Sequence, residues 1–452
     1  MGMNFPTSPQ AGDRYPVTPV PDTPQYLWNG ITWLSVAPVA DEGSSIYVGD
    51  TPPPSLPDKA LWWESDSGKL MLRYADGDSS QWVQTALTTS PGVSRATLYA
   101  APFDAMAYSG MQINGSFDVS QEKALGASTV TADGYACDGW QLGLSGALTG
   151  NLITGSSGLF PGISGYLRLN AVSGATPATT DHLCIVHRIE GYRLSRLAWG
   201  TANAQPVTIG FWVRNTLAGT YSVAVRNSLS DRSYVTSYTQ NVADAQEYKT
   251  ITIPGCTDGV WQTGNLVGAI ILFTLAAGPG RVTASPNTWV SANASTVAGQ
   301  VNGAAATTNY LRLGGVVVLP GIEAPSAAQS SLIMRPFDQE LLACKRYFET
   351  SYPPNLSVGT ATWDGAELDT ISPANARRPT RWQVPFTVVK RAFPTGKIYS
   401  PQNGAVGNIW NSSINVSGSV FNGDWRSGNA VLGADQAPNT QLQYHWTADA
   451  RL

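Results

Sequence analysis

The stretch Val207-Thr-Ile-Gly-Phe-Trp-Val-Arg-Asn-Thr-Leu-Ala-Gly-Thr-Tyr-Ser-Val-Ala-Val225 decides the fold class of this 452-residue chain. Apolar residues occupy every second position from Val207 to Val213, and the same period of two returns from Tyr221 to Val225. This period is that of a β-strand with one buried face. Residues 215–219 lie between the two runs and contain the Asn and Gly that suit a turn. The stretch therefore predicts two short β-strands.

The surrounding region, residues 126–323, has the same character. Short strand patterns recur there without helical patterns between them, which indicates a β-sandwich of the jelly-roll kind. Tyr166-Leu-Arg-Leu169 returns as Tyr310-Leu-Arg-Leu313, which predicts two similar strands near the ends of the region. Residues 291–309 are rich in Ala, Ser, Thr, Gly and Asn, and we expect a long surface loop there.

Residues 1–90 contain two turn-punctuated modules that predict small β-meanders stapled by tryptophan. Asn29-Gly30 lies between aromatic runs, which is a strong hairpin signal. The second module runs from Trp62-Trp63 to Trp82. Residues 91–125 form a connector, in which 95–107 has helical composition but is interrupted by Pro102.

The C-terminal region, residues 324–452, is predicted to be a β-rich domain with one amphipathic helix. Phe337, Leu341, Cys344 and Phe348 fall at helical spacing, and Asp338 is placed to cap a helix over 338–349. Strand patterns follow at 381–389, 397–399, 414–421 and 442–446. The fold class expected for the whole chain is mainly β.

Composition excludes several classes of function. Only 13% of the residues are charged and the net charge is -4, so the chain lacks the cation excess that nucleic-acid binding requires. The longest apolar run, 267–277, is too short to cross a bilayer, and we expect no membrane insertion. Residues 1–10 have neither a basic nor an apolar signal region, so no signal peptide is expected. The four scattered cysteines predict isolated buried thiols. Because the three histidines are also scattered, we expect no metal site and no cofactor.

Several blocks of the sequence resemble those of tail-fibre and related appendage proteins of tailed bacteriophages and prophages. They are Tyr99–Tyr108, Met111–Glu122, Tyr135–Trp140, Phe211–Arg214, Gly219–Tyr221, Phe337–Tyr347, Trp446–Leu452 and the tryptophan-rich N-terminal modules. The resemblance implies a structural virion protein of the fibre or surface-appendage type, assembled in the host bacterial cytoplasm and located in the virion. Related modules also occur in head fibres, so a head or neck fibre, decoration or connector protein with a purely architectural role is the first alternative.

A polysaccharide depolymerase is the second alternative. The sequence has no nucleophile elbow, phosphate-binding loop or metalloprotease helix. Its carboxylates near aromatic residues are Asp118, Glu122, Asp133, Asp138 and Glu190. A glycoside hydrolase needs two carboxylates across one sugar, which sequence separation cannot show. We therefore predict no catalytic residue and no enzyme activity.

Aromatic side chains in and beside the sandwich give the hypothesis for a binding site, because flat rings stack on sugars. The candidate glycan-binding residues are Trp140, Trp199, Trp212, Trp261 and Trp289. The same residues suit a core, where an indole buries a large apolar area. Trp212 lies on the strand face opposite Ile209 and Phe211, so it belongs either to a second buried face or to a ligand face.

These observations also predict the partners. Low charge and edge-rich β modules favour a homotrimer. We expect residues 1–90 to attach the chain to other virion structural proteins. The sandwich then faces a host surface glycan, which it binds without cleavage in a groove bordered by residues 291–309.

Overall fold

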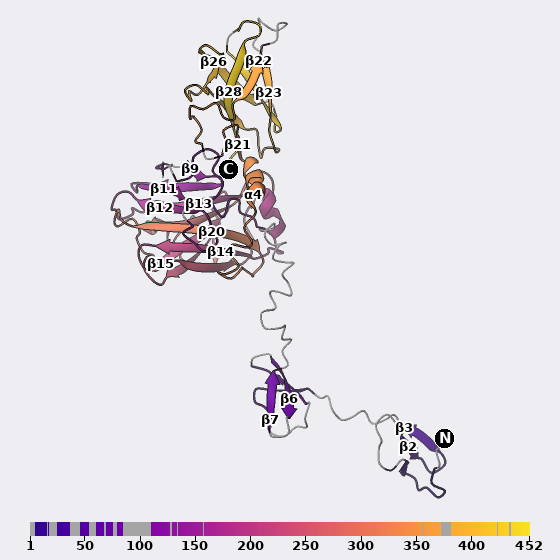
Figure 1. Ribbon diagram of the computed structural model, residues 1–452. Coiled ribbons are helices and arrows are strands. Elements are labelled where there is room, and N and C mark those ends of the chain that lie inside the picture. The colour runs from indigo at the N-terminus through magenta and orange to yellow at the C-terminus, as the bar shows by residue number, and fades with distance from the viewer. Residues whose placement is uncertain are drawn as a thin grey trace. The chain divides into compact units, whose positions relative to one another are not determined.

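The computed structural model describes residues 5–15, 17, 25–36, 46–53, 60–66, 69–75, 79–84 and 110–452, except 127–128, 133, 157, 355, 372–380, 423 and 434. The chain divides into two compact units, Met1–Ala100 and Ala101–Leu452 (Figure 1). The described residues are mainly β, as predicted. Among them, no helix is both long and apolar enough to cross a membrane.

The first unit contains two small sheets. One consists of β1 (Arg14–Tyr15), β2 (Gln25–Trp28) and β3 (Trp33–Val36). The other consists of β4 (Tyr47–Gly49), β5 (Leu61–Glu64), β6 (Lys69–Ala75) and β7 (Ser80–Gln84). The predicted hairpin is present, because Trp28 pairs with Trp33 and the Asn29 side chain accepts hydrogen bonds from the amides of Ile31 and Thr32. The helical pattern at 95–107 lies outside the described residues.

The second unit opens with a sandwich of two antiparallel sheets. The seven-stranded sheet has the order β19 (Trp289–Val290), β16 (Ser233–Gln240), β15 (Gly219–Arg226), β18 (Val267–Ala277), β13 (His182–Glu190), β10 (Trp140–Ser145) and β9 (Gly134–Cys137). The six-stranded sheet has the order β17 (Glu247–Ile253), β14 (Val207–Asn215), β20 (Tyr310–Pro320), β12 (Tyr166–Ala171), β11 (Gly150–Gly155) and β8 (Thr129–Val130). Short helical turns lie at α3 (Gly191–Leu194), η1 (Ser195–Leu197) and η2 (Pro279–Arg281).

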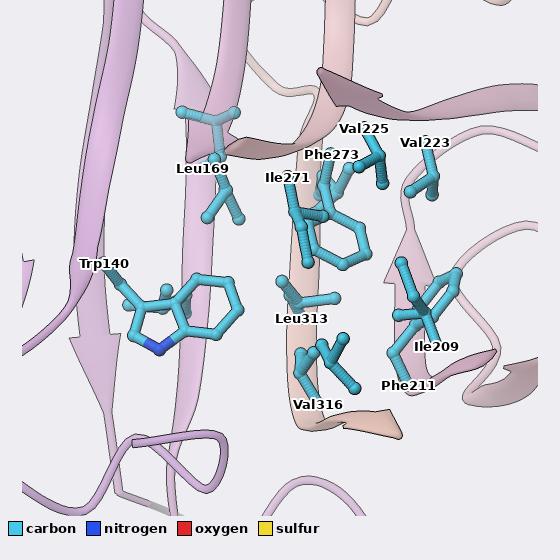
Figure 2. Packing of buried hydrophobic residues seen from close by; sticks show 14 of the residues in the cluster. Trp140, Leu169, Ile209, Phe211, Val223, Val225, Ile271, Phe273, Leu313 and Val316 are labelled. Atoms are coloured by element: carbon cyan, nitrogen blue, oxygen red, sulfur yellow. The ribbon is translucent and has the colours of Figure 1, made fainter. Parts of the chain in front are cut away.

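The core lies between these two sheets. Figure 2 shows Ile209 and Phe211 of β14 near Val223 and Val225 of β15, with Phe273 beside them. The predicted alternation is therefore correct, and the turn at 215–219 carries the chain from one sheet to the other. The four cysteines are free and buried, as expected.

The outer face of the seven-stranded sheet is apolar and covered. Cys184, Val186 and Leu272 point away from the core and pack against Ala294 and Val297 of the 291–309 segment. Backbone atoms of that segment also bond to the sheet, from the Val297 amide to Ser222 and from Thr274 to the Ser295 carbonyl. Residues 294–297 of the predicted loop therefore cover this face instead of bordering an open groove, since burying an apolar surface lowers the free energy.

The C-terminal region begins with helix α4 (Phe337–Lys345), which ends before the predicted residue 349. Its N-cap residue is Pro336 without a side-chain cap, and Asp338 lies inside the first turn instead of capping it. The remainder is a sheet of β21 (Phe348–Thr350), β28 (Gln441–Asp449), β25 (Asn408–Trp410), β26 (Asn415–Asn422), β27 (Ser427–Leu432) and β23 (Arg381–Pro385). Two further strands, β22 (Glu367–Thr370) and β24 (Thr395–Tyr399), pair with β28.

Candidate functional site

The predicted tryptophans serve mainly as packing residues. Trp140 has no exposed surface, stacks on His187 with ring centroids 4.4 Å apart, and donates its indole N–H to the carbonyls of Ile113 and Asn114. Trp212 is 8% exposed, packs against Phe160 and donates to Ser330 Oγ. A buried ring has no free face for a sugar, so neither residue offers a stacking platform.

The other three predicted tryptophans form one cluster. Trp199, Trp261 and Trp289 meet edge to face, with centroids 4.7, 5.3 and 5.4 Å apart. Each indole N–H donates to a backbone carbonyl nearby. Trp199 and Trp261 are buried, and only Trp289 is half-buried. This cluster joins loops together, and its rings cover one another.

Most of the carboxylates near aromatic residues are held by hydrogen bonds or ion pairs within the protein, and Glu122 and Asp138 line one small cavity. Glu190 is buried and accepts both guanidinium hydrogen bonds of Arg346, at 2.6 and 2.9 Å, and one from Tyr347. Asp138 is buried near the Gln121 amide, and burial raises the pKa of its carboxyl to about 7. Asp133 lies outside the described residues. Within the described ranges, no group of three His, Cys, Asp or Glu side chains could hold a metal ion.

A polar cleft of about 430 Å³ lies beside β24 and β28, and its charged groups are largely paired with one another. Arg451 forms ion pairs with Glu122 and Asp449. Arg391 donates to the backbone carbonyls of Asn265, Ala450 and Arg451. These contacts tie chain segments together, and Thr395, Lys397 and Tyr399 also line the cleft.

One part of the outer face of the six-stranded sheet, around Trp212, Val317 and Leu319, is apolar and covered. Another part is different, because polar and aromatic side chains lie on it in cross-strand rows. Arg168, Arg312 and Arg214 stand directly opposite one another on β12, β20 and β14, and we call them the arginine row. The next row, here called the polar row, holds Asn151, Asn170 and Tyr310 on β11, β12 and β20. Leucines at the alternate positions of β12 and β20 are in the core, so both rows point outward.

Tyr310 is the centre of this face. The guanidinium of Arg312 lies 4.4 Å from its ring centroid and that of Arg168 lies 4.6 Å away. The Tyr310 hydroxyl donates to Asp244, and burial together with this hydrogen bond raises the pKa of Tyr310. The ring is therefore held in place by contacts on several sides while the side chain stays half-buried.

One carboxylate borders the arginine row. Arg214 donates from Nε and Nη2 to the two oxygens of Asp244, at 2.8 and 2.6 Å. The Arg214 and Tyr310 hydrogen bonds hold the pKa of Asp244 well below its usual range. Asp244 thus stays ionised and neutralises Arg214, while its side chain remains 46% exposed.

The remaining groups of this face can orient hydroxyls. Asn170 donates from Nδ2 to Asn151 Oδ1 at 2.6 Å, which leaves other donor and acceptor positions on both amides. Tyr166 lies above Gly155, where an added Cβ would come within 2.2 Å of the ring. A rigid sheet therefore presents two tyrosine rings among amides, guanidiniums and a carboxylate, which is the kind of polar and aromatic mixture that can bind a sugar chain.

This polar face was not predicted from the sequence, although the sequence contains a pattern that indicates it. The repeated Tyr-Leu-Arg-Leu pattern predicts that tyrosine and arginine share one strand face, opposite the leucines. The structure adds that the two copies pair with each other, with Arg168 opposite Arg312.

No protein-family model matches the sequence, and no curated protein matches it. Among solved structures, the enzymatically active domain of tailspike protein 4 of bacteriophage CBA120 is similar over 47% of this chain, with 12% identity and a TM-score of 0.24. An arabinose-bound α-L-arabinofuranosidase matches over 47%, with 8% identity and a TM-score of 0.26. The match covers 22% of the tailspike chain and 27% of the arabinofuranosidase chain.

A family 11 carbohydrate-binding module of Clostridium thermocellum, solved with a mixed-linked tetrasaccharide, matches over 45% of this chain and 100% of its own. Its identity is 12% and its TM-score 0.23. Because these scores are low, we base the function on the side chains of this chain.

Proposed function

We propose that this chain is a structural virion protein of a tailed bacteriophage, of the fibre or surface-appendage type, whose sandwich binds a host surface glycan without cleaving it. The outer face of the six-stranded sheet carries the binding part of the proposal, because Tyr310 and Tyr166 lie there among Asn170, Asn151 and the arginine row. The sequence blocks that resemble phage appendages support the virion part.

The site is expected to bind weakly as a single copy. Sugar hydroxyls exchange hydrogen bonds with water for hydrogen bonds with protein, so the net gain per bond is about 1 kcal/mol. Many copies on one particle raise the avidity without any new contact. A homotrimer, attached to the particle through residues 1–90, would provide part of this multiplicity.

The experiment measures binding of the full chain to a panel of capsular and lipopolysaccharide glycans, together with the release of reducing ends. We expect Tyr310→Ala and Asn170→Ala to weaken binding several-fold, with no reducing ends released by any form of the protein. Trp363→Ala is the matched control, because Trp363 is a 49% exposed aromatic residue of the C-terminal domain and lies outside this face.

Two results would contradict the proposal. Equal binding by wild type and both face variants would place glycan recognition elsewhere on the chain. Release of reducing ends would favour the depolymerase alternative.

A further inference from the structure

Two of the three cations in the arginine row have no anionic partner. Arg214 is paired with Asp244, but within the described parts of the chain the side chains of Arg168 and Arg312 make no ion pair and no hydrogen bond. Their Nε atoms are buried without any hydrogen-bond partner. The row therefore carries three positive charges and one negative charge over three adjacent strands.

This arrangement costs free energy when the face is empty. Like charges directly opposite one another on neighbouring strands destabilise a sheet. The chain contains only 27 Lys and Arg in 452 residues, so crowding three of them in one cross-strand row is not a consequence of a basic composition. Stacking on Tyr310 offsets part of the repulsion, because a guanidinium is attracted to the face of an aromatic ring.

Stacking also prepares the two guanidiniums for a ligand. The guanidinium of Arg312 lies 4.4 Å from the Tyr310 centroid and 5.8 Å from that of Tyr166, so it contacts two tyrosine rings. A guanidinium that is fixed by an aromatic ring keeps its outer N–H groups free for a planar, two-pronged acceptor. A carboxylate is such an acceptor, and charge-assisted pairs with it are short and strong.

We infer that the arginine row selects acidic saccharides, with the carboxylate of a hexuronic acid bound between Arg168 and Arg312 and its ring hydroxyls bound by Asn170 and Asn151. The inference rests on the proposed glycan-binding function and names the class of sugar. A sugar phosphate is also anionic, but its phosphate is tetrahedral and carries a charge of about −1.5 to −2 at pH 7. The experiment therefore compares a sugar phosphate with the uronates.

The test uses the full chain and ligand-observed saturation-transfer NMR with glucuronate, galacturonate, glucose 6-phosphate, glucose and galactose. Glucuronate or galacturonate is expected to bind at least tenfold more tightly than its neutral parent sugar. Added salt should weaken this binding in part, because the arginines of the row are half-buried and salt screens the part of each charge that faces solvent. Arg312→Gln and Arg168→Gln should each reduce uronate binding roughly ten- to a hundredfold, as expected for a lost charge-assisted hydrogen bond. Arg312→Lys keeps the charge but not the fork, and should recover only part of the binding.

We expect the arginine variants to fold, since removing one like charge from the row relieves repulsion. The comparison of acidic with neutral sugars also uses the wild-type protein and needs no variant. Arg281→Gln provides the control, because Arg281 lies in η2, outside this face.

The possible outcomes separate the two proposals. Equal binding of uronates and neutral sugars, abolished by Tyr310→Ala, would overturn the acidic selectivity and leave the glycan site standing. Preference for glucose 6-phosphate over both uronates would overturn the assignment of a carboxylate. Absence of binding to every sugar and to the whole polysaccharide panel would overturn the proposed function itself.

Discussion

Replacing Glu349 by Gln should strongly destabilise the C-terminal region, because in the described structure Glu349 is the only carboxylate that contacts the buried ammonium of Lys390. The side chains of Lys390 and Glu349 are 0% and 4% exposed, and Lys390 Nζ donates to Glu349 Oε2. Its other contacts are the Lys345 carbonyl at 2.6 Å and the Phe386 ring at 4.9 Å. Burial lowers the pKa of Lys390 and the Glu349 charge opposes this effect.

The loss in free energy of unfolding caused by Glu349→Gln has an upper bound that depends on pH. Leaving one charge of a buried pair without its partner costs about 3–5 kcal/mol. Lys390 can escape this cost by releasing its proton, which costs about 1.4 kcal/mol for each pH unit below an ordinary lysine pKa of about 10.4. The bound is therefore about 5 kcal/mol at pH 7 and about 2 kcal/mol at pH 9. The unfolded chain then binds more protons than the folded one, so the stability of Glu349→Gln rises with pH in this window.

Lys390→Met should cost less than Glu349→Gln. The Glu349 carboxylate would retain hydrogen bonds from the Thr387 amide and hydroxyl, and it lies 3.7 Å from the Lys345 ammonium. The double variant should lose no more stability than Glu349→Gln alone, because an apolar replacement of a whole buried pair is often neutral.

Urea unfolding of the full chain at pH 7 and pH 9, followed by near-ultraviolet circular dichroism, measures these differences at equal m-values. Glu323→Gln and Lys397→Met are the controls, since both residues are exposed. The reasoning is refuted when Glu349→Gln resembles Glu323→Gln, or when its loss of stability is the same at both pH values.

Two further predictions concern titration and assembly. Burial raises the pKa of Asp138 to about 7 and lowers that of His187 to about 4. Between pH 4 and 6.5, Asp138 is therefore protonated in the folded chain and ionised in the unfolded chain. His187 is neutral in the folded chain and protonated in the unfolded chain over the same range. Asp138→Asn should therefore make the free energy of unfolding rise more steeply with pH in this window, and His187→Gln should make it fall. Each substitution should change the slope by about 1 kcal/mol per pH unit, as measured by urea unfolding, and parallel profiles for both variants and wild type would contradict this. Light scattering should give a mass near three chains, both for the full protein and after deletion of residues 1–90. Only the full chain should be incorporated into particles. A stable monomer, or incorporation of the shortened chain, would contradict the proposed assembly.

The sequence predicted the strands well, but it did not predict which residues pack against their outer faces. Alternation from Val207 to Val213 predicted β14, because the side-chain period of a strand is visible in local sequence. Whether Trp212 faces a ligand or a second packing layer depends on Phe160 and Ser330, which are distant in sequence. No local pattern contains that information.

The helix boundary failed for a related reason. Phe348 continues the helical spacing of apolar residues, so the pattern predicts a helix to residue 349. The structure instead pairs Phe348 with Asp449 and Thr350 with Thr447. Backbone hydrogen bonds to β28, which is about a hundred residues away in sequence, override the local helical pattern, as tertiary contacts commonly do.

The two outer faces of the sandwich show how this chain separates packing from binding. Around Val186 and Leu272 the outer face of the seven-stranded sheet is apolar, and the 291–309 segment covers it. The outer face of the six-stranded sheet is covered in the same way around Val317 and Leu319, whereas Arg168, Arg312 and Tyr310 occupy outward positions on its polar part. A sheet face that stays open must not cause the protein to associate when no ligand is bound. It must also bind its ligand more favourably than it binds water. Guanidiniums stacked on tyrosine meet both conditions, since their charge prevents the sheet-to-sheet association that an apolar face would invite, and their fixed orientation lowers the entropy lost when an anionic sugar binds.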